Sequence, residues 1–331
     1  MSWRVSAMAH IETWRPYTSC YVGLVGLAGG CLASRHPDGW RLLAAWAIPT
    51  LGWLAGLYGG DYFDRALDAI SKPQRPIPSG RLAPGTALGA MIAIIGAAAV
   101  WTVLLNWRAL AVVACATVVG LSYNGFFKAR GLSGNLVRGS LTSFAVLFGA
   151  LLTGGSIDLT LVCVALVFAL QDSGSNLVGA LRDIDGDRAG GYLTYPVRRG
   201  VTPAVRVVAG LVAGWAVLAL VTVAVSAPRG RLWCVLPLTA AIVMSSSVVI
   251  RLYRSRNTLT RPFALHMHEV LCLERIVLAS ALIAWGAGTA AAIAVGIPAL
   301  TVTWLSQVKL RARHEFAALP VAAASAVDLA R

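Results

Sequence analysis

The chain has 331 residues, of which 57% are apolar and only 13% are charged. Soluble domains carry roughly 25% charged residues, so this composition excludes a soluble enzyme, a disordered chain and a small disulfide-stapled domain. The 28 Lys and Arg against 14 Asp and Glu give a net charge of +14. In a polytopic membrane protein such an excess is typical of cytoplasmic loops, so we predict a lipid bilayer, and no nucleic acid, as the partner of this surface.

Long apolar runs follow one another along the chain. A membrane-spanning helix needs about 20 mostly apolar residues, and the candidates are 18–34, 42–60, 84–105, 109–125, 139–154, 158–180, 207–226, 232–250, 268–285 and 288–306. The last two runs form either one broken element or two helices. We therefore predict an all-α bundle of nine, or ten, transmembrane helices in one integral-membrane domain over residues 1–331.

Basic residues are distributed unevenly between the loops. The segments after the second, fourth, sixth and eighth apolar runs hold most of the Lys and Arg, whereas the alternate segments hold few. Because cytoplasmic loops are enriched in Lys and Arg, we predict a multi-pass protein of the cell membrane. Its N-terminus and these basic segments face the cytoplasm.

Three of the few carboxylates lie where the second apolar run ends. Asp61, Asp64 and Asp68 are spaced i, i+3, i+7, which puts them on one face of a helix. Like charges arranged in this way repel one another, so a purely structural role requires a cation beside them. Lys72 and Arg75 follow at once in a Pro- and Gly-rich loop on the predicted cytoplasmic side.

A second acid cluster lies at the end of the sixth apolar run. Asp183 and Asp187 are four residues apart and share a helical face, which Asn176 extends by seven residues toward the membrane; Arg182 comes directly before them. Two acid clusters on the same membrane side suit a hard divalent cation, and Mg²⁺ binds through a few carboxylates together with substrate phosphates. The structural alternative is that these acids solvate helix ends and pair with neighbouring Arg.

A third polar segment follows the fourth apolar run. Lys128 is a point cation suited to a phosphate, and Tyr123 offers a hydroxyl donor. Alone, this is an ordinary interfacial Tyr and Lys pair. Further along the chain, Glu274 and Arg275 either line the mouth of a cavity or form an interfacial ion pair, and the ion pair is the preferred interpretation.

The order of these segments resembles the UbiA superfamily of intramembrane prenyltransferases. The resemblance spans residues 13–200 by motif and the rest of the chain by hydropathy. It rests on Asp61-x-x-Asp64-x-x-x-Asp68, Lys-Pro-x-Arg-Pro-Ile-Pro-Ser-Gly-Arg (72–81), Tyr123…Lys128, Asp183-x-x-x-Asp187-Arg188, the opening segment 13–18 and Thr-Tyr-Pro-Val (194–197). The first acid motif departs from the family at Gly60, where an Asn that binds Mg²⁺ is usual.

The resemblance implies an all-helical bundle with a lipid-open cavity that binds an isoprenyl diphosphate through Mg²⁺. The metal ligands implied are Asp61, Asp64, Asp68, Asp183 and Asp187, with Asp64, Asp68, Asp183 and Asp187 essential for catalysis. The residues expected to bind the substrate are Lys72, Arg75, Tyr123, Lys128, Asn176 and Arg182.

The leading functional prediction is Mg²⁺-dependent prenyl transfer to an apolar acceptor, with an aromatic acceptor preferred. An allylic carbocation needs a pocket that excludes water, and aromatic faces stabilise cations; Trp46, Trp53, Phe144, Phe148 and Phe168 are candidates for this role or for ordinary packing. The alternative is a terpene cyclase without an acceptor, which Gly60 favours. A transporter would place its acids near helix midpoints, where Asp172 is the one partial example. The sequence leaves the oligomeric state open.

Overall fold

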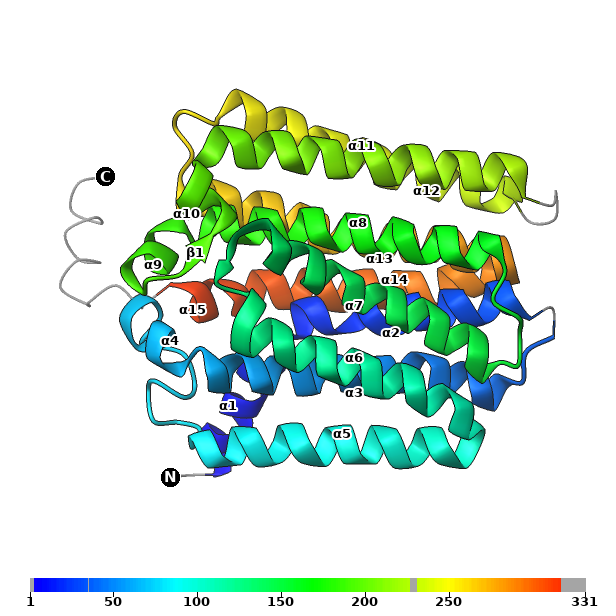
Figure 1. Ribbon diagram of the computed structural model, residues 1–331, viewed down its shortest axis with the longest axis horizontal. Helices are drawn as coiled ribbons and strands as arrows, with labels where there is room; N and C mark the ends of the chain where they lie inside the picture. The colour runs from blue at the N-terminus through cyan, green and yellow to red at the C-terminus, as the bar shows by residue number, and fades with distance from the viewer. Residues whose placement is uncertain (1–2, 35, 227–230, 317–331) are drawn as a thin grey trace.

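The protein forms a bundle of long helices that run side by side along one axis (Figure 1). The computed structural model describes residues 3–34, 36–226 and 231–316. Residues 1–2, 35, 227–230 and 317–331 lie outside this described part. The predicted single domain over residues 1–331 includes these positions and stays a prediction.

Ten long helices make up the bundle in the described part of the chain. They are α2 (Pro16–Ala33), α3 (Gly39–Phe63), α5 (Pro84–Asn106), α6 (Leu110–Ser122), α7 (Gly131–Leu152), α8 (Leu159–Arg182), α11 (Val201–Val225), α12 (Arg231–Arg254), α13 (Arg261–Ala287) and α14 (Thr289–Ser306). The shorter elements are α1 (Trp3–Trp14), α4 (Arg65–Ser71), η1 (Trp107–Ala109), η2 (Tyr123–Phe127), α9 (Ile184–Ala189), β1 (Leu193–Thr194), α10 (Tyr195–Arg199), η3 (Gln307–Arg311) and α15 (Ala312–Glu315).

The all-α membrane bundle predicted from the sequence is confirmed. By length and composition, eight stretches of the described residues can cross a membrane, and one of them, Pro84–Phe127, contains both α5 and α6. The predicted count of nine or ten crossings stays a prediction. Large apolar side chains on the outer helices, such as Leu104, Val225 and Leu236, are about 80% exposed, as expected for a lipid-facing surface.

Small residues bring the central helices together. α7 packs against both α2 and α8, and α13 packs against α2, α8 and α14. A Cβ placed on Gly149 of α7 would overlap the carbonyl oxygen of Gly26 on α2. Close backbone approach at small residues is how helices associate in membranes, where burial of apolar surface supplies little driving force. The α2–α7 contact therefore requires Gly at position 149.

We expect Gly149→Ala to lower the melting temperature of the purified protein in detergent. The added methyl group meets backbone atoms, which cannot rotate away, and overpacking of this kind costs about 1–3 kcal/mol. Tryptophan fluorescence during heating measures the effect. Gly210→Ala on α11 is the matched control, because a Cβ there meets no atom within 4 Å. Equal melting temperatures for the two variants would contradict this explanation.

The short elements α4, α9, β1, α10 and α15 gather at one end of the bundle, around the acid motifs (Figure 1). The first motif crosses the junction between α3, which ends at Phe63, and α4, which begins at Arg65. The second motif crosses the junction between α8 and α9. Each motif thus lies where a membrane-length helix gives way to a short one, rather than along one continuous helix as the spacing predicts.

Candidate active site

A cavity of about 630 Å³ extends into the bundle from the end that carries the two acid motifs, which we call the acid end. Its acid end is lined by Asp64, Asp68, Lys72, Arg75, Lys128, Arg182, Asp183 and Asp187. Its deeper part is largely apolar and is lined by residues that include Ile48, Trp53, Ala55, Met91, Ile95, Leu141, Phe144 and Phe148. One cavity therefore joins a charged end to an apolar interior.

The acids of the first motif are buried, and each faces a cation. Asp64 pairs with Lys128, and Asp68 accepts hydrogen bonds from Nη1 of Arg75 at 2.8 and 2.9 Å. Asp61 pairs with Arg15 and lies outside the lining that the described residues form. The repulsion expected between three neighbouring carboxylates is thus offset by three separate cations, and two of the three acids reach the cavity.

The second motif brings further cations to the same end. Asp183 accepts hydrogen bonds from Arg182 at 3.0 and 2.5 Å, and the Lys72 ammonium lies 3.1 Å from its Oδ1. Burial acts to raise the pKa of Asp183, but Arg182 and Lys72 hold it well below its usual range. Lys72 therefore connects the loop after the first motif to the second motif.

Asp187 differs from its neighbour because no cation contacts it directly among the described residues. It accepts a hydrogen bond of 3.0 Å from the hydroxyl of Thr194. Burial, followed by the charge of Asp183, raises the pKa of Asp187 to about 6. Among the carboxylates at the acid end, Asp187 is therefore the one that a bound cation would stabilise most.

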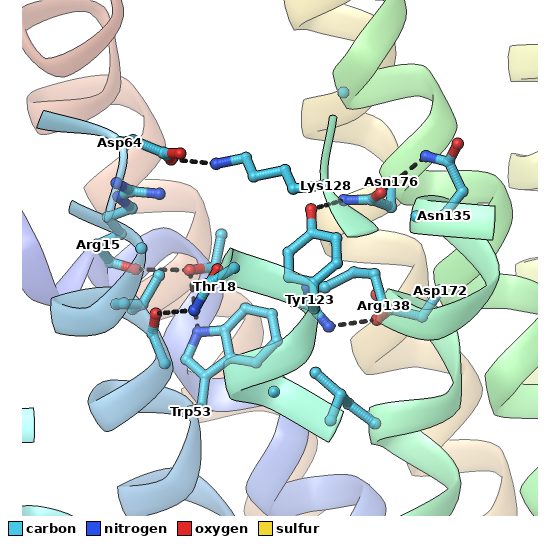
Figure 2. Close-up of a pocket in the computed structure, with 18 of the residues that line it drawn as sticks. Arg15, Thr18, Trp53, Asp64, Tyr123, Lys128, Asn135, Arg138, Asp172 and Asn176 are labelled. Carbon is cyan, nitrogen blue, oxygen red and sulfur yellow. Dashed lines mark hydrogen bonds and ion pairs between the residues drawn. The ribbon is translucent and has the colours of Figure 1, made fainter. Parts of the chain in front are cut away.

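A π-helical turn places Tyr123 and Lys128 together. Residues five apart diverge on an α-helix, but η2 is a π-helix, and the Lys128 amide donates to the Tyr123 carbonyl at 2.9 Å. Both side chains therefore enter the cavity from one side, with Lys128 toward Asp64 and Tyr123 beside Asn176 (Figure 2). The Tyr123 hydroxyl lies 3.5 Å from Nδ2 of Asn176, whose Oδ1 accepts from Asn135 at 2.7 Å.

β1 holds this loop against the second motif. The Leu193 amide donates to the Ala129 carbonyl at 3.0 Å, next to Lys128. Just before β1, the Tyr192 hydroxyl lies 3.4 Å from Oδ1 of Asp64. The segment that follows Asp187 thus contacts both Asp64 of the first motif and the loop that carries Lys128, the partner of Asp64.

Sequence reasoning missed two residues at this end, Tyr192 and Glu315. The carboxylate of Glu315, in α15, lies 3.0 Å from Arg182 and 3.3 Å from Lys72. Burial acts to raise the pKa of Glu315, but Arg182 and Lys72 hold it well below its usual range. The sequence signal that could have identified Glu315 is its position as an acid directly after a run of basic residues near the C-terminus.

The candidate aromatic residues separate into two groups. Trp53, Phe144 and Phe148 line the cavity. Phe168 is fully buried in the core between α2, α8 and neighbouring helices, and Trp46 lines a different, apolar pocket between α2, α3 and α14. Only the first group is placed to face a substrate.

The interpretation of Glu274 and Arg275 as an interfacial ion pair is wrong. Both side chains are buried within the bundle on α13, and they bind different partners. Glu274 accepts a hydrogen bond of 2.5 Å from Gln171, whereas Arg275 pairs with Asp172 at 2.9 Å. Asp172 and Arg275 line the cavity.

The donor set at the acid end fits a hard divalent cation. Asp64, Asp68, Asp183 and Asp187 supply carboxylate oxygens, which Mg²⁺ prefers. Within residues 3–34, 36–226 and 231–316, no group of three or more His, Cys, Asp or Glu converges on one point as the side chains stand. The reason is that the acids other than Asp187 are turned toward cations, so a metal would have to exchange with those ion pairs.

Comparison with known proteins defines the class of protein. Residues 22–270 match the UbiA prenyltransferase family. The chain therefore belongs to this family, and the resemblance drawn from the two acid motifs is confirmed.

Two relatives are named for the same activity. Digeranylgeranylglyceryl phosphate synthase of Natronomonas pharaonis is 34% identical over 61% of this chain and 73% of that protein. The synthase of Thermococcus kodakarensis is 29% identical over 73% of this chain and 87% of that protein.

Solved structures share the fold. A UbiA homolog from Archaeoglobus fulgidus bound to GPP and Mg²⁺ has a TM-score of 0.63 at 13% identity, covering 83% of this chain and 99% of that one. A UbiA homolog from Aeropyrum pernix K1 has a TM-score of 0.68 at 16% identity, covering 80% and 96%. The chain thus has the UbiA fold. The family match and the membrane-length helices make it a multi-pass membrane prenyltransferase.

Proposed function

We propose that the protein transfers a prenyl group from an isoprenyl diphosphate to a lipid-soluble acceptor in a Mg²⁺-dependent reaction. The observation that carries this proposal is the cavity itself, in which both acid motifs and their cations form one end and the interior is largely apolar. A diphosphate suits the charged end, and a prenyl chain suits the interior.

Each predicted site residue has a proposed role. Asp64, Asp68, Asp183 and Asp187 would hold Mg²⁺. Asp61 contacts Arg15 in the structure and stays a predicted ligand. Bound Mg²⁺ supplies charge stabilisation for the departing diphosphate. Lys72, Arg75, Lys128 and Arg182 bind the diphosphate oxygens, with Tyr123 and Asn176 as hydrogen-bonding groups at the same site.

The apolar interior protects the reacting carbon. Departure of diphosphate leaves an allylic carbocation, which water would capture in an open site. Trp53, Phe144 and Phe148 line the interior and present aromatic faces to it. The acceptor then attacks the cation, and the proton that it loses passes to a base.

Two classes of acceptor remain to be compared by experiment. The sequence resemblance favours an aromatic acceptor, and the activity for which the relatives are named indicates a prenylglyceryl phosphate. Purified protein in detergent is incubated with Mg²⁺ and geranylgeranyl diphosphate, either alone or with each acceptor class. We expect pyrophosphate release and a prenylated product only with an acceptor. A cyclic hydrocarbon formed without acceptor would contradict transfer and support the cyclase alternative.

The pKa of Asp187 predicts how the Mg²⁺ requirement depends on pH. This carboxyl has a pKa of about 6, raised by burial and by Asp183. A proton therefore competes with the metal below that pH, since metal ligands must be deprotonated. We expect the Mg²⁺ concentration for half-maximal activity to be severalfold higher at pH 5.5 than at pH 7.5. The same comparison with Asp187→Asn isolates this residue, and an unchanged requirement in the wild type would contradict the assignment.

We also propose that the acid end faces the cytoplasm of the cell membrane. The basic segments that follow α3, η2, α8 and α12 lie at the end of the bundle where α4, α9 and α15 gather (Figure 1). Their Lys and Arg content supports a cytoplasmic position. Labelling of single cysteines placed in these loops, in intact cells and in permeabilised cells, tests the orientation.

A further inference from the structure

The C-terminal segment of the described chain contributes a carboxylate to the acid end of the cavity. Glu315, in α15, is 3% exposed and lines the cavity beside the acid motifs. Its Oε1 lies 3.0 Å from Nη1 of Arg182, and its Oε2 lies 3.3 Å from Nζ of Lys72. Lys72 and Arg182 are also two of the groups proposed above to bind the diphosphate. Glu315 therefore occupies part of the position that a diphosphate would take.

Each of these two cations faces a second carboxylate as well. Asp183 accepts hydrogen bonds from Nε and Nη2 of Arg182 and lies 3.1 Å from the Lys72 ammonium. Glu315 takes Nη1, the third nitrogen of the same guanidinium. A diphosphate oxygen placed between the two carboxylates would lie against like charge. It can therefore bind these cations only when one of the two carboxylates withdraws.

Asp183 is held firmly in this arrangement. It lies at the junction between α8 and α9, and it directly follows Arg182 in the chain. α8 packs along α7, α11 and α13 in the centre of the bundle. A displacement of Asp183 would therefore move a helix end that also carries Arg182, one of the cations to be freed.

Glu315 is held by a much shorter element. α15 has four residues, Ala312–Glu315. Apart from the Glu315 carboxylate, polar contacts to its backbone seat it. Nη2 of Arg261 donates to the Glu315 carbonyl at 2.8 Å, and Nε2 of Gln74 donates to the His314 carbonyl at 3.0 Å. Short segments of this kind open at a lower free energy than core helices do. Of the two acids, Glu315 is therefore the one that can withdraw.

The seated position of α15 also leaves polar atoms unsatisfied. His314 is 3% exposed, and its ring lies against Tyr17 with the ring centres 6.4 Å apart. Neither ring nitrogen of His314 has a hydrogen-bond partner among the described residues. Buried polar groups without partners cost free energy. Part of the cost of withdrawing Glu315 is therefore recovered when His314 reaches water.

An exchange of one anion for another keeps the two cations paired. Before substrate binds, Glu315 compensates Lys72 and Arg182, and buried charges without such a partner are costly. When a diphosphate binds, its oxygens take over that role and the Glu315 carboxylate is released. An internal anion of this kind lowers the affinity for diphosphate by the free energy that its release requires.

We propose that Glu315 is an autoinhibitory anion, which occupies the diphosphate-binding cations of the substrate-free protein and is displaced by the metal–diphosphate. The seated α15 and the bound diphosphate are then mutually exclusive. This assignment rests on the proposed prenyl transfer and deepens it by giving its substrate site a regulating segment. The exchange is ionic and non-covalent, so it requires no step beyond binding.

The test measures binding and does not depend on turnover. Calorimetry on the purified full-length protein in detergent and Mg²⁺ compares the wild type with Glu315→Gln, using a non-hydrolysable geranylgeranyl diphosphate analogue. Gln keeps the size of the side chain and removes the charge that must leave. We expect the variant to bind the analogue roughly tenfold more tightly, the order of one hydrogen bond to a charged group. Geranylgeraniol, which lacks the diphosphate, should bind both proteins equally.

Glu12→Gln is the matched control. Glu12 pairs with Arg81 at 2.7 Å, and neither residue belongs to the cavity lining that the described residues form. This variant loses a carboxylate from an ion pair elsewhere and should bind the analogue like the wild type.

Hydrogen exchange of the wild type provides a measurement that needs no variant. Addition of Mg²⁺ and the analogue should speed exchange of the backbone amides in residues 312–316, because withdrawal of the segment opens it to water. Mass spectrometry of the peptides that contain these residues follows the change.

Three results would overturn the proposal. These are equal or weaker binding of the analogue by Glu315→Gln, an equal gain in affinity for geranylgeraniol, and slower or unchanged exchange of residues 312–316 in the wild type. The exchange measurement uses the wild type alone, so it stands even if a variant misfolds. Failure of the proposed function would appear differently, as absent binding of the analogue to the wild type and to Glu315→Gln alike.

Discussion

Asp64→Asn and Asp187→Asn should each reduce prenyl transfer by at least about 100-fold, the size of effect seen when one group that stabilises developing charge is removed. Both carboxylates line the acid end of the cavity, one from each motif. Asn keeps the shape of the side chain and removes its charge, so the loss should come from metal and diphosphate binding. Product formation from geranylgeranyl diphosphate and acceptor, followed by chromatography, measures the effect.

Asp185→Asn is the matched control for this experiment. Asp185 lies two residues from Asp187, but its side chain is 94% exposed and pairs with Arg188. We expect this variant to keep wild-type activity and melting temperature. If it lost activity as Asp187→Asn does, general disturbance of α9 would explain both results. If Asp64→Asn and Asp187→Asn both kept full turnover, the site assignment would be wrong.

Removal of divalent metal should abolish turnover, and added Mg²⁺ should restore it. Asp64, Asp68 and Asp183 contact Lys128, Arg75 and the Lys72–Arg182 pair respectively. The groups that would bind diphosphate are thus engaged by the same carboxylates that would bind the metal. Dialysis against EDTA, followed by assays with and without Mg²⁺, tests this expectation.

Diphosphate binding provides an independent measurement of the same prediction. Because metal binding would draw the acids away from their cations, we expect a geranylgeranyl diphosphate analogue to bind much more weakly in EDTA than in Mg²⁺. Calcium serves as a control for charge alone, since it prefers more ligands at longer distances than Mg²⁺. Full turnover in EDTA would contradict a metal-dependent mechanism.

The sequence predicts the fold class and the acid motifs because both depend on local signals. Apolar runs of membrane length give the helices, and acids are so scarce that two groups of them near one membrane face are conspicuous. The spacing of Asp61, Asp64 and Asp68 also predicts that cations must lie beside them, and Arg15, Lys128 and Arg75 are those cations.

The remaining features of the site depend on tertiary structure. With the α-helical period of 3.6 residues, the side chains of Tyr123 and Lys128 would point in different directions, and the π-helical turn brings them together. Arg138, Asp172 and Arg275 come from three helices far apart in sequence, so no spacing relates them. Glu315 reaches the site from the C-terminal segment for the same reason.

The near balance of charge at the acid end has a thermodynamic consequence. The carboxylates of the two motifs and Glu315 face a comparable number of Lys and Arg side chains. Such a surface attracts neither a free diphosphate nor a free metal ion strongly. When the two arrive together, the carboxylates can bind the metal ion and the Lys and Arg side chains can bind the diphosphate. Metal and substrate affinities should therefore be linked, and linkage of this kind is reciprocal. The protein would then select the metal–diphosphate complex over either component, which limits occupation by unrelated phosphates or stray cations.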